Sequence, residues 1–228
     1  MKRIMELKPE AFLFDLDGTL IDSEMLWVRA IVGWLAAQDI TTDENTIAAL
    51  VLGHSWLDIH TSLLDNFPSL PRNSAARDAL DLRLHYDRLA IEPTSIIIPS
   101  AIAFYKAAAK IAPCAIVSGS PHSDVANAVQ LCGIAQETAF VLGGEDYARG
   151  KPAPDGYLLA AQRLGVPPAR CIVFEDSTAG VRSGLAAGMT VVGIDRGTVI
   201  RQDFTGCLFT VHDLAEIMDA TYGLPHQR

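Results

Sequence analysis

The chain has 228 residues and a formal net charge of −9, and 50% of its residues are hydrophobic. At about 100–200 residues per domain, this length allows one large domain or one domain with a smaller insert. The acidic balance argues against nucleic-acid binding, which needs a basic surface. The cysteines, at positions 114, 132, 171 and 207, form no C-x-x-C pair. This spacing excludes a zinc ribbon and argues against a disulfide framework.

Targeting and membrane-spanning segments are not predicted. The apolar run at residues 11–14 is far shorter than the hydrophobic region of a signal peptide. No stretch approaches the length of about 20 apolar residues that is needed to cross a bilayer. We therefore expect a cytoplasmic protein that binds neither membranes nor nucleic acid.

Short, continuous apolar runs recur along the chain and predict strands that are buried on both faces, as in a parallel sheet. Helical patterns lie between the later runs, at residues 100–111, 123–131, 155–164 and 177–187. This alternation predicts an α/β fold with a doubly wound, Rossmann-like parallel sheet. The predicted strands are residues 11–14, 114–117, 140–142, 171–174 and 191–194.

The segment after the first strand breaks this alternation. Residues 22–92 contain no convincing strand, and helical patterns fit residues 23–38, 43–52, 56–66 and 74–90. Asp43 and Ser74 are suitable N-caps. An insert at this point follows the carboxyl end of a strand, where α/β sheets bind their ligands. The all-helical segment is therefore a candidate lid.

Two pairs of acidic residues follow predicted strands. Asp15 and Asp17 come after the first run, and Glu175 and Asp176 come after the run at 171–174. Two carboxylates about 5 Å apart repel each other by about 3 kcal/mol at an effective dielectric of 20. If the strands are parallel, the four carboxylates converge at one edge of the sheet. A divalent cation with oxygen ligands would relieve their repulsion, and Mg²⁺ is the usual choice beside a phosphate.

Two other strand ends supply groups that suit an anion. Ser118-Gly119-Ser120 follows the second run and offers a hydroxyl and flexible backbone amides near a helix start. Lys151 precedes Pro152 and Pro154, which stiffen the chain just before another helix. His122, after the serine loop, is placed either to cap the helix that follows or to touch the substrate, and we favour the cap.

These four motifs, in this order and each at a strand end, resemble those of the haloacid dehalogenase-like (HAD) superfamily. They are Asp15-x-Asp17-Gly18-Thr19, Val117-Ser118-Gly119-Ser120, Lys151-Pro152-x-Pro154-Asp155 and Phe174-Glu175-Asp176-Ser177. The resemblance covers about residues 10–195. The position of the helical insert resembles the C1-cap subfamily, which includes sugar-phosphate phosphatases and β-phosphoglucomutase. It implies a catalytic core at residues 1–20 and 94–228, a helical cap at 21–93, and a monomer.

The resemblance also implies roles for individual residues. Asp15 would be the nucleophile that forms an aspartyl-phosphate, and Asp17 the general acid and then the general base. Gly18 and Thr19 would shape the turn, with Thr19 near the phosphate. Ser118 and the backbone at Gly119 would bind phosphoryl oxygens, and Lys151 would neutralise the phosphate and orient Asp15. Mg²⁺ would be held by Asp15, the Asp17 main-chain carbonyl and Asp176, with Glu175 binding directly or through water.

Departures from the family patterns favour one chemistry. Asp17 favours phosphoryl transfer, because 2-haloacid dehalogenases lack a second aspartate at this place. Residues 22–92 contain no lysine, which opposes the Schiff-base chemistry of phosphonoacetaldehyde hydrolases. Leu52 and Trp56 stand where the β-phosphoglucomutase cap loop has a lysine and an arginine. A phosphatase is therefore favoured, with a phosphosugar mutase as the alternative and a catalytically silent binding module as a remote one.

The cap is expected to determine substrate choice. Gly53, His54, Ser55 and Trp56 are candidate contacts to the leaving group, and a sugar or sugar-acid phosphate is the expected substrate. Residues 22–92 carry five basic and eleven acidic side chains, a net charge of −6. The remaining residues carry 13 basic and 16 acidic side chains, a net charge of −3. The acidity therefore lies mainly on the predicted lid.

Overall fold

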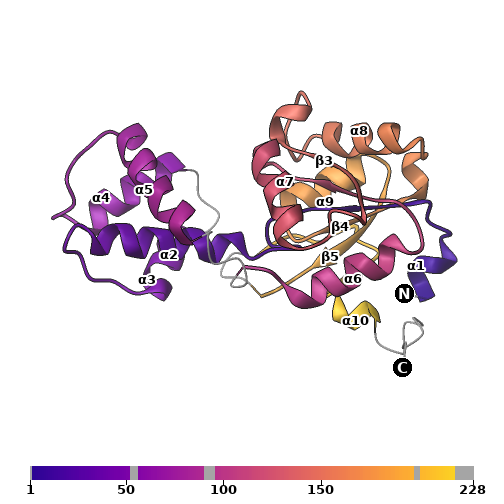
Figure 1. Ribbon diagram of the computed structural model, residues 1–228, viewed down its shortest axis with the longest axis horizontal. Helices are drawn as coiled ribbons and strands as arrows, with labels where there is room; N and C mark the ends of the chain where they lie inside the picture. The colour runs from indigo at the N-terminus through magenta and orange to yellow at the C-terminus, as the bar shows by residue number, and fades with distance from the viewer. Residues whose placement is uncertain (1, 52–55, 90–95, 198–200, 219–228) are drawn as a thin grey trace. The chain divides into compact units, whose positions relative to one another are not determined.

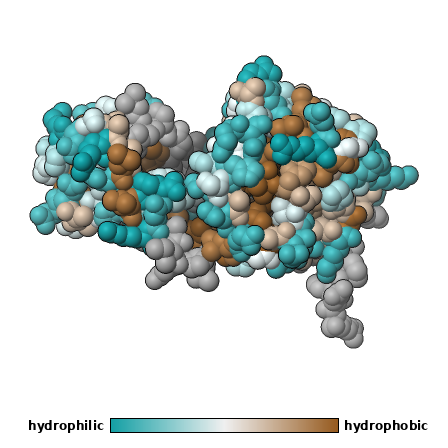
Figure 2. Space-filling model, turned by 45° about the horizontal axis from the view of Figure 1, so that its top comes forward, coloured by the Kyte–Doolittle hydropathy of each residue, from teal (hydrophilic) through white to brown (hydrophobic). Residues whose placement is uncertain are grey.

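The computed structural model describes residues 2–51, 56–89, 96–197 and 201–218. Its contacts divide the chain into two compact units. We call residues 1–21 and 97–228 the core unit, and residues 22–96 the helical unit. Hydrophilic side chains cover most of the face of each unit that Figure 2 shows. Within the described ranges, no helix is long and apolar enough to cross a membrane.

In the described part of the core unit, six parallel strands form one sheet in the order β3-β2-β1-β4-β5-β6 (Figure 1). The predicted α/β fold with a parallel sheet is thus confirmed. The sheet contains all five predicted strands and also β6, which the sequence did not predict. The strands are β1 (Ala11–Phe14), β2 (Cys114–Val117), β3 (Thr138–Leu142), β4 (Cys171–Glu175), β5 (Thr190–Ile194) and β6 (Phe209–Val211).

Helices cover both faces of the sheet. Alternate residues of each strand point to opposite faces, so each face packs its own side chains against its own helices. Ala11 and Leu13 pack with Tyr157 of α8 and Val181 of α9. On the other face, Phe14 contacts two aromatic rings of α6. The helices are α1 (Lys2–Glu6), α6 (Pro99–Ala109), α7 (His122–Leu131), α8 (Asp155–Leu164), α9 (Thr178–Ala186) and α10 (Ala215–Met218), with 3-10 turns η2 (Gly144–Asp146) and η3 (Pro168–Arg170).

The interior of the sheet is apolar and contains free thiols. All four residues of β1 and of β2 are buried, as the continuous apolar runs predicted. Each of the four cysteines is free, and three of them are buried.

The helical unit has a core of its own, in which Val28, Trp34, Ile47, Leu63 and Leu82 are buried together. Asp43 accepts a hydrogen bond from the Thr46 backbone amide (3.0 Å), and Ser74 accepts one from Arg77 (3.3 Å), so both residues cap helices as predicted. The helices are α2 (Ser23–Ala36), α3 (Glu44–Val51), α4 (Trp56–Asn66) and α5 (Ala75–Leu89).

Candidate active site

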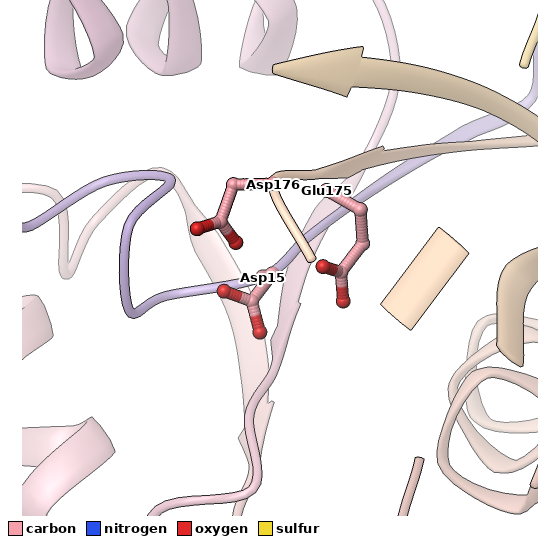
Figure 3. A group of neighbouring side chains, drawn as sticks. All are labelled: Asp15, Glu175 and Asp176. Atoms are coloured by element: carbon pink, nitrogen blue, oxygen red, sulfur yellow. The ribbon is translucent and has the colours of Figure 1, made fainter. Parts of the chain in front are cut away.

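The candidate site begins where β1 and β4 end side by side. The two strands pair in parallel with Phe14 opposite Phe174, so Asp15 and Glu175 leave the sheet at the same level. The Asp15 backbone amide donates to the Phe174 carbonyl at 3.0 Å. Oxygen atoms of Asp15, Glu175 and Asp176 lie within 4.8 Å of one another (Figure 3). Three of the four carboxylates that were predicted to converge at this edge therefore lie together.

Lys151 lies among these carboxylates. Its Nζ donates to Asp15 Oδ1 (2.5 Å), Glu175 Oε1 (2.5 Å) and the Val117 carbonyl (3.0 Å). An ammonium group has three hydrogens, so these acceptors use all of them. Burial alone would lower the pKa of Lys151, but the charges of Asp15 and Glu175 outweigh it and raise the pKa well above its usual value. Lys151 is therefore a buried cation at neutral pH.

Asp15 is 6% exposed and lies in an environment with excess negative charge. Burial raises its pKa well above the usual value. Lys151 opposes this effect, while the charges of Glu175 and Asp176 add to it. One ammonium group against three close carboxylates leaves the cluster negative. A divalent cation would correct this imbalance, and carboxylate oxygens are the ligands that Mg²⁺ prefers.

Glu175 is fully buried and accepts four hydrogen bonds. Oε1 receives them from Lys151 and from the Tyr157 hydroxyl (2.8 Å), and Oε2 from the amide (3.3 Å) and hydroxyl (3.1 Å) of Ser177. A Cβ on Gly180 would lie 1.8 Å from Glu175 Oε1, so glycine leaves the space that this carboxylate fills. Both oxygens are thus engaged by the protein.

Asp17 lies beside the serine loop that follows β2. Its Oδ2 accepts hydrogen bonds from the hydroxyls of Ser118 (3.0 Å) and Ser120 (2.8 Å). The Ser120 amide donates in turn to Ser118 Oγ at 3.0 Å. Both hydroxyls and the second carboxylate of the Asp15 motif therefore meet at the ends of β1 and β2. Apart from its chain neighbours, no described residue has an atom within 4 Å of a Cβ built on Gly119, so there is open space on that side of the loop.

The turn after Asp17 requires glycine. Gly18 has φ of +83°, a left-handed conformation that glycine adopts without steric cost. A Cβ there would also lie 1.9 Å from Asp176 Oδ2. Thr19 is fully buried, and Arg196 donates to the carbonyls of Gly18 (2.9 Å) and Thr19 (3.3 Å).

His122 does not cap α7, so that prediction was wrong. The helix begins at His122 itself, with Pro121 as the N-cap residue and no side-chain capping bond. The His122 ring instead lies 2.6 Å from Asp146 Oδ2, and its backbone amide donates to Glu145 at 2.9 Å. These acidic partners from η2 are distant in sequence and could not be predicted from the local pattern.

The predicted site residues of the core unit come together. Gly53, His54 and Ser55 lie outside the described residues. Sequence reasoning also missed Tyr157 and Arg196. Tyr157 is a fully buried tyrosine, whose hydroxyl usually has a partner, but its burial is not evident from the sequence. Arg196 lies outside every motif. The predicted site residues of the core unit are Asp15, Asp17, Thr19, Ser118, Gly119, Lys151, Glu175 and Asp176.

Comparison with known proteins agrees with this arrangement. The model of the haloacid dehalogenase-like hydrolase family matches residues 9–188. The chain belongs to this family and is therefore an enzyme of the hydrolase class. It is 34% identical over 195 residues to hexitol phosphatase A of Escherichia coli K12, covering 83% of this chain and 84% of that protein. It is also 31% identical to the protein CbbY of Rhodobacter capsulatus, over 97% and 99% of the two chains.

Solved structures show the same fold. A HAD family hydrolase from Deinococcus radiodurans, determined with bound phosphate and sodium, has a TM-score of 0.74 at 27% identity and covers 93% of this chain and 94% of its own. CbbY from Rhodobacter sphaeroides, in complex with phosphate, has a TM-score of 0.70 at 26% identity and covers 92% and 96%.

Proposed function

We propose that the protein is a Mg²⁺-dependent phosphatase that hydrolyses a small phosphorylated metabolite through an aspartyl-phosphate on Asp15. The observation that carries the proposal is that Lys151 donates to Asp15 at 2.5 Å, while Asp17, two residues further along the same turn, accepts hydrogen bonds from the Ser118 and Ser120 hydroxyls. A nucleophile, a cation and a second carboxylate are the groups that transfer of a phosphoryl group to water requires. The names of hexitol phosphatase A and of the fructose-1-phosphate phosphatase YqaB of E. coli favour a sugar phosphate as the substrate class.

In the first half-reaction, an Asp15 oxygen attacks phosphorus and forms the acyl-phosphate bond. The bond from phosphorus to the ester oxygen breaks, and Asp17 gives its proton to the departing alkoxide. In the second half-reaction, Asp17 takes a proton from water, whose oxygen attacks phosphorus. Phosphate leaves, and the Asp15 carboxylate is restored. One acid–base group serves both steps because the proton that it gives in the first is regained in the second.

The contacts of Glu175 and Asp176 suggest different roles for these two carboxylates. Asp15, Asp176 and the main-chain carbonyl of Asp17 would hold Mg²⁺. When bound, this ion would offset the negative charge that the phosphoryl group brings to the cluster. Glu175 would instead hold Lys151 in place, since its oxygens accept hydrogen bonds from Lys151, Tyr157 and Ser177. Lys151 and the Ser118 hydroxyl would bind phosphoryl oxygens.

We further propose that the helical segment, residues 21–93, acts as a lid over the catalytic core formed by residues 1–20 and 94–228. Gly53, His54 and Ser55 would contact the part of the substrate that departs. Under this proposal the core performs the chemistry on any accessible phosphate ester, and the lid selects among metabolites.

The direct test is hydrolysis of para-nitrophenyl phosphate with and without Mg²⁺. We expect metal-dependent release of nitrophenol, and a loss of roughly a thousandfold or more in Asp15→Asn, which removes the nucleophile. Undiminished release in Asp15→Asn would contradict the assignment of Asp15. A panel of sugar phosphates and sugar-acid phosphates then identifies the substrate. Efficient conversion of β-glucose 1-phosphate to glucose 6-phosphate, with a bisphosphate primer, would instead identify a mutase.

A further inference from the structure

We infer that Arg196 is a positioning residue, which fixes the turn carrying Asp15 and Asp17 against Asp176. This inference rests on the proposed function, because that function makes these three carboxylates the working groups. Arg196 Nε donates to the Gly18 carbonyl at 2.9 Å, and Nη2 donates to the Thr19 carbonyl at 3.3 Å. The guanidinium group therefore donates to two consecutive backbone carbonyls, those of the two residues that follow Asp17.

Backbone amides of this turn donate to carbonyls of the same turn. The carbonyls of Gly18 and Thr19 accept hydrogen bonds from Arg196. The Gly18 amide donates to the Ile21 carbonyl (2.7 Å), and the amides of Thr19 and Leu20 both donate to the Leu16 carbonyl (3.3 and 2.8 Å). With its carbonyls held as well, each peptide unit after Gly18 and Thr19 is restrained at both ends. The restraint is needed because Gly18, with its left-handed φ, is the residue with the greatest backbone freedom.

Arg196 also connects strands that are not neighbours. It follows β5, and β4 lies between β5 and β1 in the sheet. The side chain thus links the loop after β5 to the turn after β1, while the residue after β4, Asp176, packs against Gly18. That contact is tight enough that a Cβ on Gly18 would lie 1.9 Å from Asp176 Oδ2. Movement of Gly18 would therefore change the spacing between Asp17 and Asp176.

The arginine is itself anchored at its other side. Nη1 lies 3.7 Å from Asp213 Oδ2, and the Ser100 hydroxyl donates to the same oxygen at 2.7 Å. The side chain is 23% exposed, so solvent screens these contacts only in part. Arginine suits this position because its planar fork can donate to two acceptors at fixed angles, whereas lysine is a point charge.

Arg170 provides a matched control at the opposite end of β1. It donates to the Leu7 carbonyl at 3.2 Å and to Glu10 at 3.0 Å, just before the strand begins. Arg170→Ala therefore removes the same side chain, with one hydrogen bond to a backbone carbonyl and one to a carboxylate. It leaves the turn after Asp17 untouched.

The experiment compares Arg196→Ala, Arg196→Lys and Arg170→Ala with the unaltered protein. Three quantities are measured: kcat and KM for para-nitrophenyl phosphate, the Mn²⁺ dissociation constant by electron paramagnetic resonance, and deuterium uptake of the peptide containing residues 16–21. For Arg196→Ala we expect kcat to fall about tenfold or more, as for loss of charge-assisted hydrogen bonds, with KM within about twofold. We also expect Mn²⁺ to bind about fivefold more weakly and deuterium uptake in residues 16–21 to rise.

Arg196→Lys keeps the positive charge but lacks the planar guanidinium group. Its kcat, Mn²⁺ dissociation constant and deuterium uptake should therefore fall between those of the alanine variant and the unaltered protein. This variant also serves if Arg196→Ala fails to fold. The inference is overturned if the Arg196 variants keep normal kcat, Mn²⁺ affinity and exchange, or if Arg170→Ala changes them equally. An unaltered protein that hydrolyses no phosphate ester would contradict the proposed function. The Mn²⁺ and exchange measurements would still decide the role of Arg196.

Discussion

At the scale of single residues, neighbours determine what each acidic side chain of the site can do. Glu175 and Asp176 are adjacent in the sequence and have the same charge. Glu175 is fully buried and accepts bonds from Lys151, Tyr157 and Ser177. Asp176 packs against Gly18 on the side of Asp15. The Tyr157 hydroxyl remains a donor at neutral pH because burial raises its pKa well above the usual value.

Tyr157→Phe tests this network by removing one hydrogen bond to Glu175 while keeping the ring. We expect kcat to fall about tenfold, since hydrogen bonds to charged groups contribute about 1.5–3 kcal/mol and the position of Lys151 depends on Glu175. The measurement is kcat for para-nitrophenyl phosphate, together with the free energy of unfolding in urea.

Tyr105→Phe is the matched control for this prediction. Tyr105 is also fully buried, and its hydroxyl lies 2.8 Å from Thr138 Oγ1, away from the site. Tyr105→Phe should lose about 0.5–1.5 kcal/mol of stability and Tyr157→Phe about 1.5–3 kcal/mol, and only Tyr157→Phe should lose kcat. Equal kcat values in the two variants would show that Tyr157 only stabilises the fold.

Residue types and spacing sufficed to predict the motif side chains, but not the partners that hold them. Asp15, Lys151 and Asp176 each follow or precede a recognisable apolar run. Arg196 contacts Gly18 across 178 positions of sequence, and the Glu175–Tyr157 bond spans 18. Such contacts depend on strand order and side-chain direction, which a single sequence does not specify.

At the scale of elements, α9 begins in direct contact with the site. Ser177 caps this helix by accepting a bond from the Gly180 amide (3.0 Å), and its hydroxyl also donates to Glu175. Gly180, in the first turn, leaves room for the Glu175 carboxylate. The Ser177 cap and the lack of a side chain at Gly180 therefore position both the start of α9 and the Glu175 carboxylate.

Gly180→Ala should be harmful even though alanine favours helices over glycine by about 1 kcal/mol. The added Cβ would lie 1.8 Å from Glu175 Oε1 and displace it, and a misplacement near 1 Å can cost about a hundredfold in rate. In α2, a Cβ on Gly33 would lie 3.6 Å from the nearest atom, His85 Nδ1, which is an ordinary contact. Gly33→Ala should therefore keep kcat and stabilise the protein by about 0.5–1 kcal/mol. Kinetics and calorimetry on both variants check this, and an active Gly180→Ala would refute it.

Element boundaries followed from the sequence where caps and apolar runs coincide. The predicted helices at residues 56–66 and 155–164 match α4 and α8. No apolar run predicted β6, a strand of three residues at the edge of the sheet, because Thr210 is exposed and interrupts its apolar pattern. An edge strand has one neighbour and needs less apolar surface than β1, so the signal that identified β1 is absent there.

At the scale of the whole molecule, the helical unit has a hydrophobic core of its own and is acidic. Its core lies entirely within residues 22–96, and it contains a buried pair in which His60 Nε2 lies 3.0 Å from Asp78 Oδ2. Asn73 donates to the other Asp78 oxygen at 3.0 Å, so both oxygens of this carboxylate are engaged. Residues 22–92 carry a net charge of −6. Under the proposed function, this unit contributes selectivity and the core unit contributes chemistry.

His54→Ala tests that division of labour. We expect kcat/KM to change by about tenfold between members of a sugar-phosphate panel, because a lost polar contact affects substrates that carry its partner. Hydrolysis of para-nitrophenyl phosphate should stay within about twofold of the unaltered protein. His85→Ala, a substitution in α5 of the helical unit, is the control and should leave the whole panel unchanged. A uniform loss across the panel and para-nitrophenyl phosphate in His54→Ala would contradict a role in selectivity.

The central place of β1 in the sheet has a consequence for protein synthesis. Phe12 pairs with Cys114 on one side and with Ile172 on the other, so β1 leaves the ribosome long before either neighbour exists. The helical unit draws its contacts from its own residues and can form them in the meantime. Asp15 gains Lys151 and then Glu175 only when most of the chain has been translated. A nascent chain that stalls before β4 therefore carries the nucleophile on an apolar strand with one edge unpaired, a species prone to aggregation.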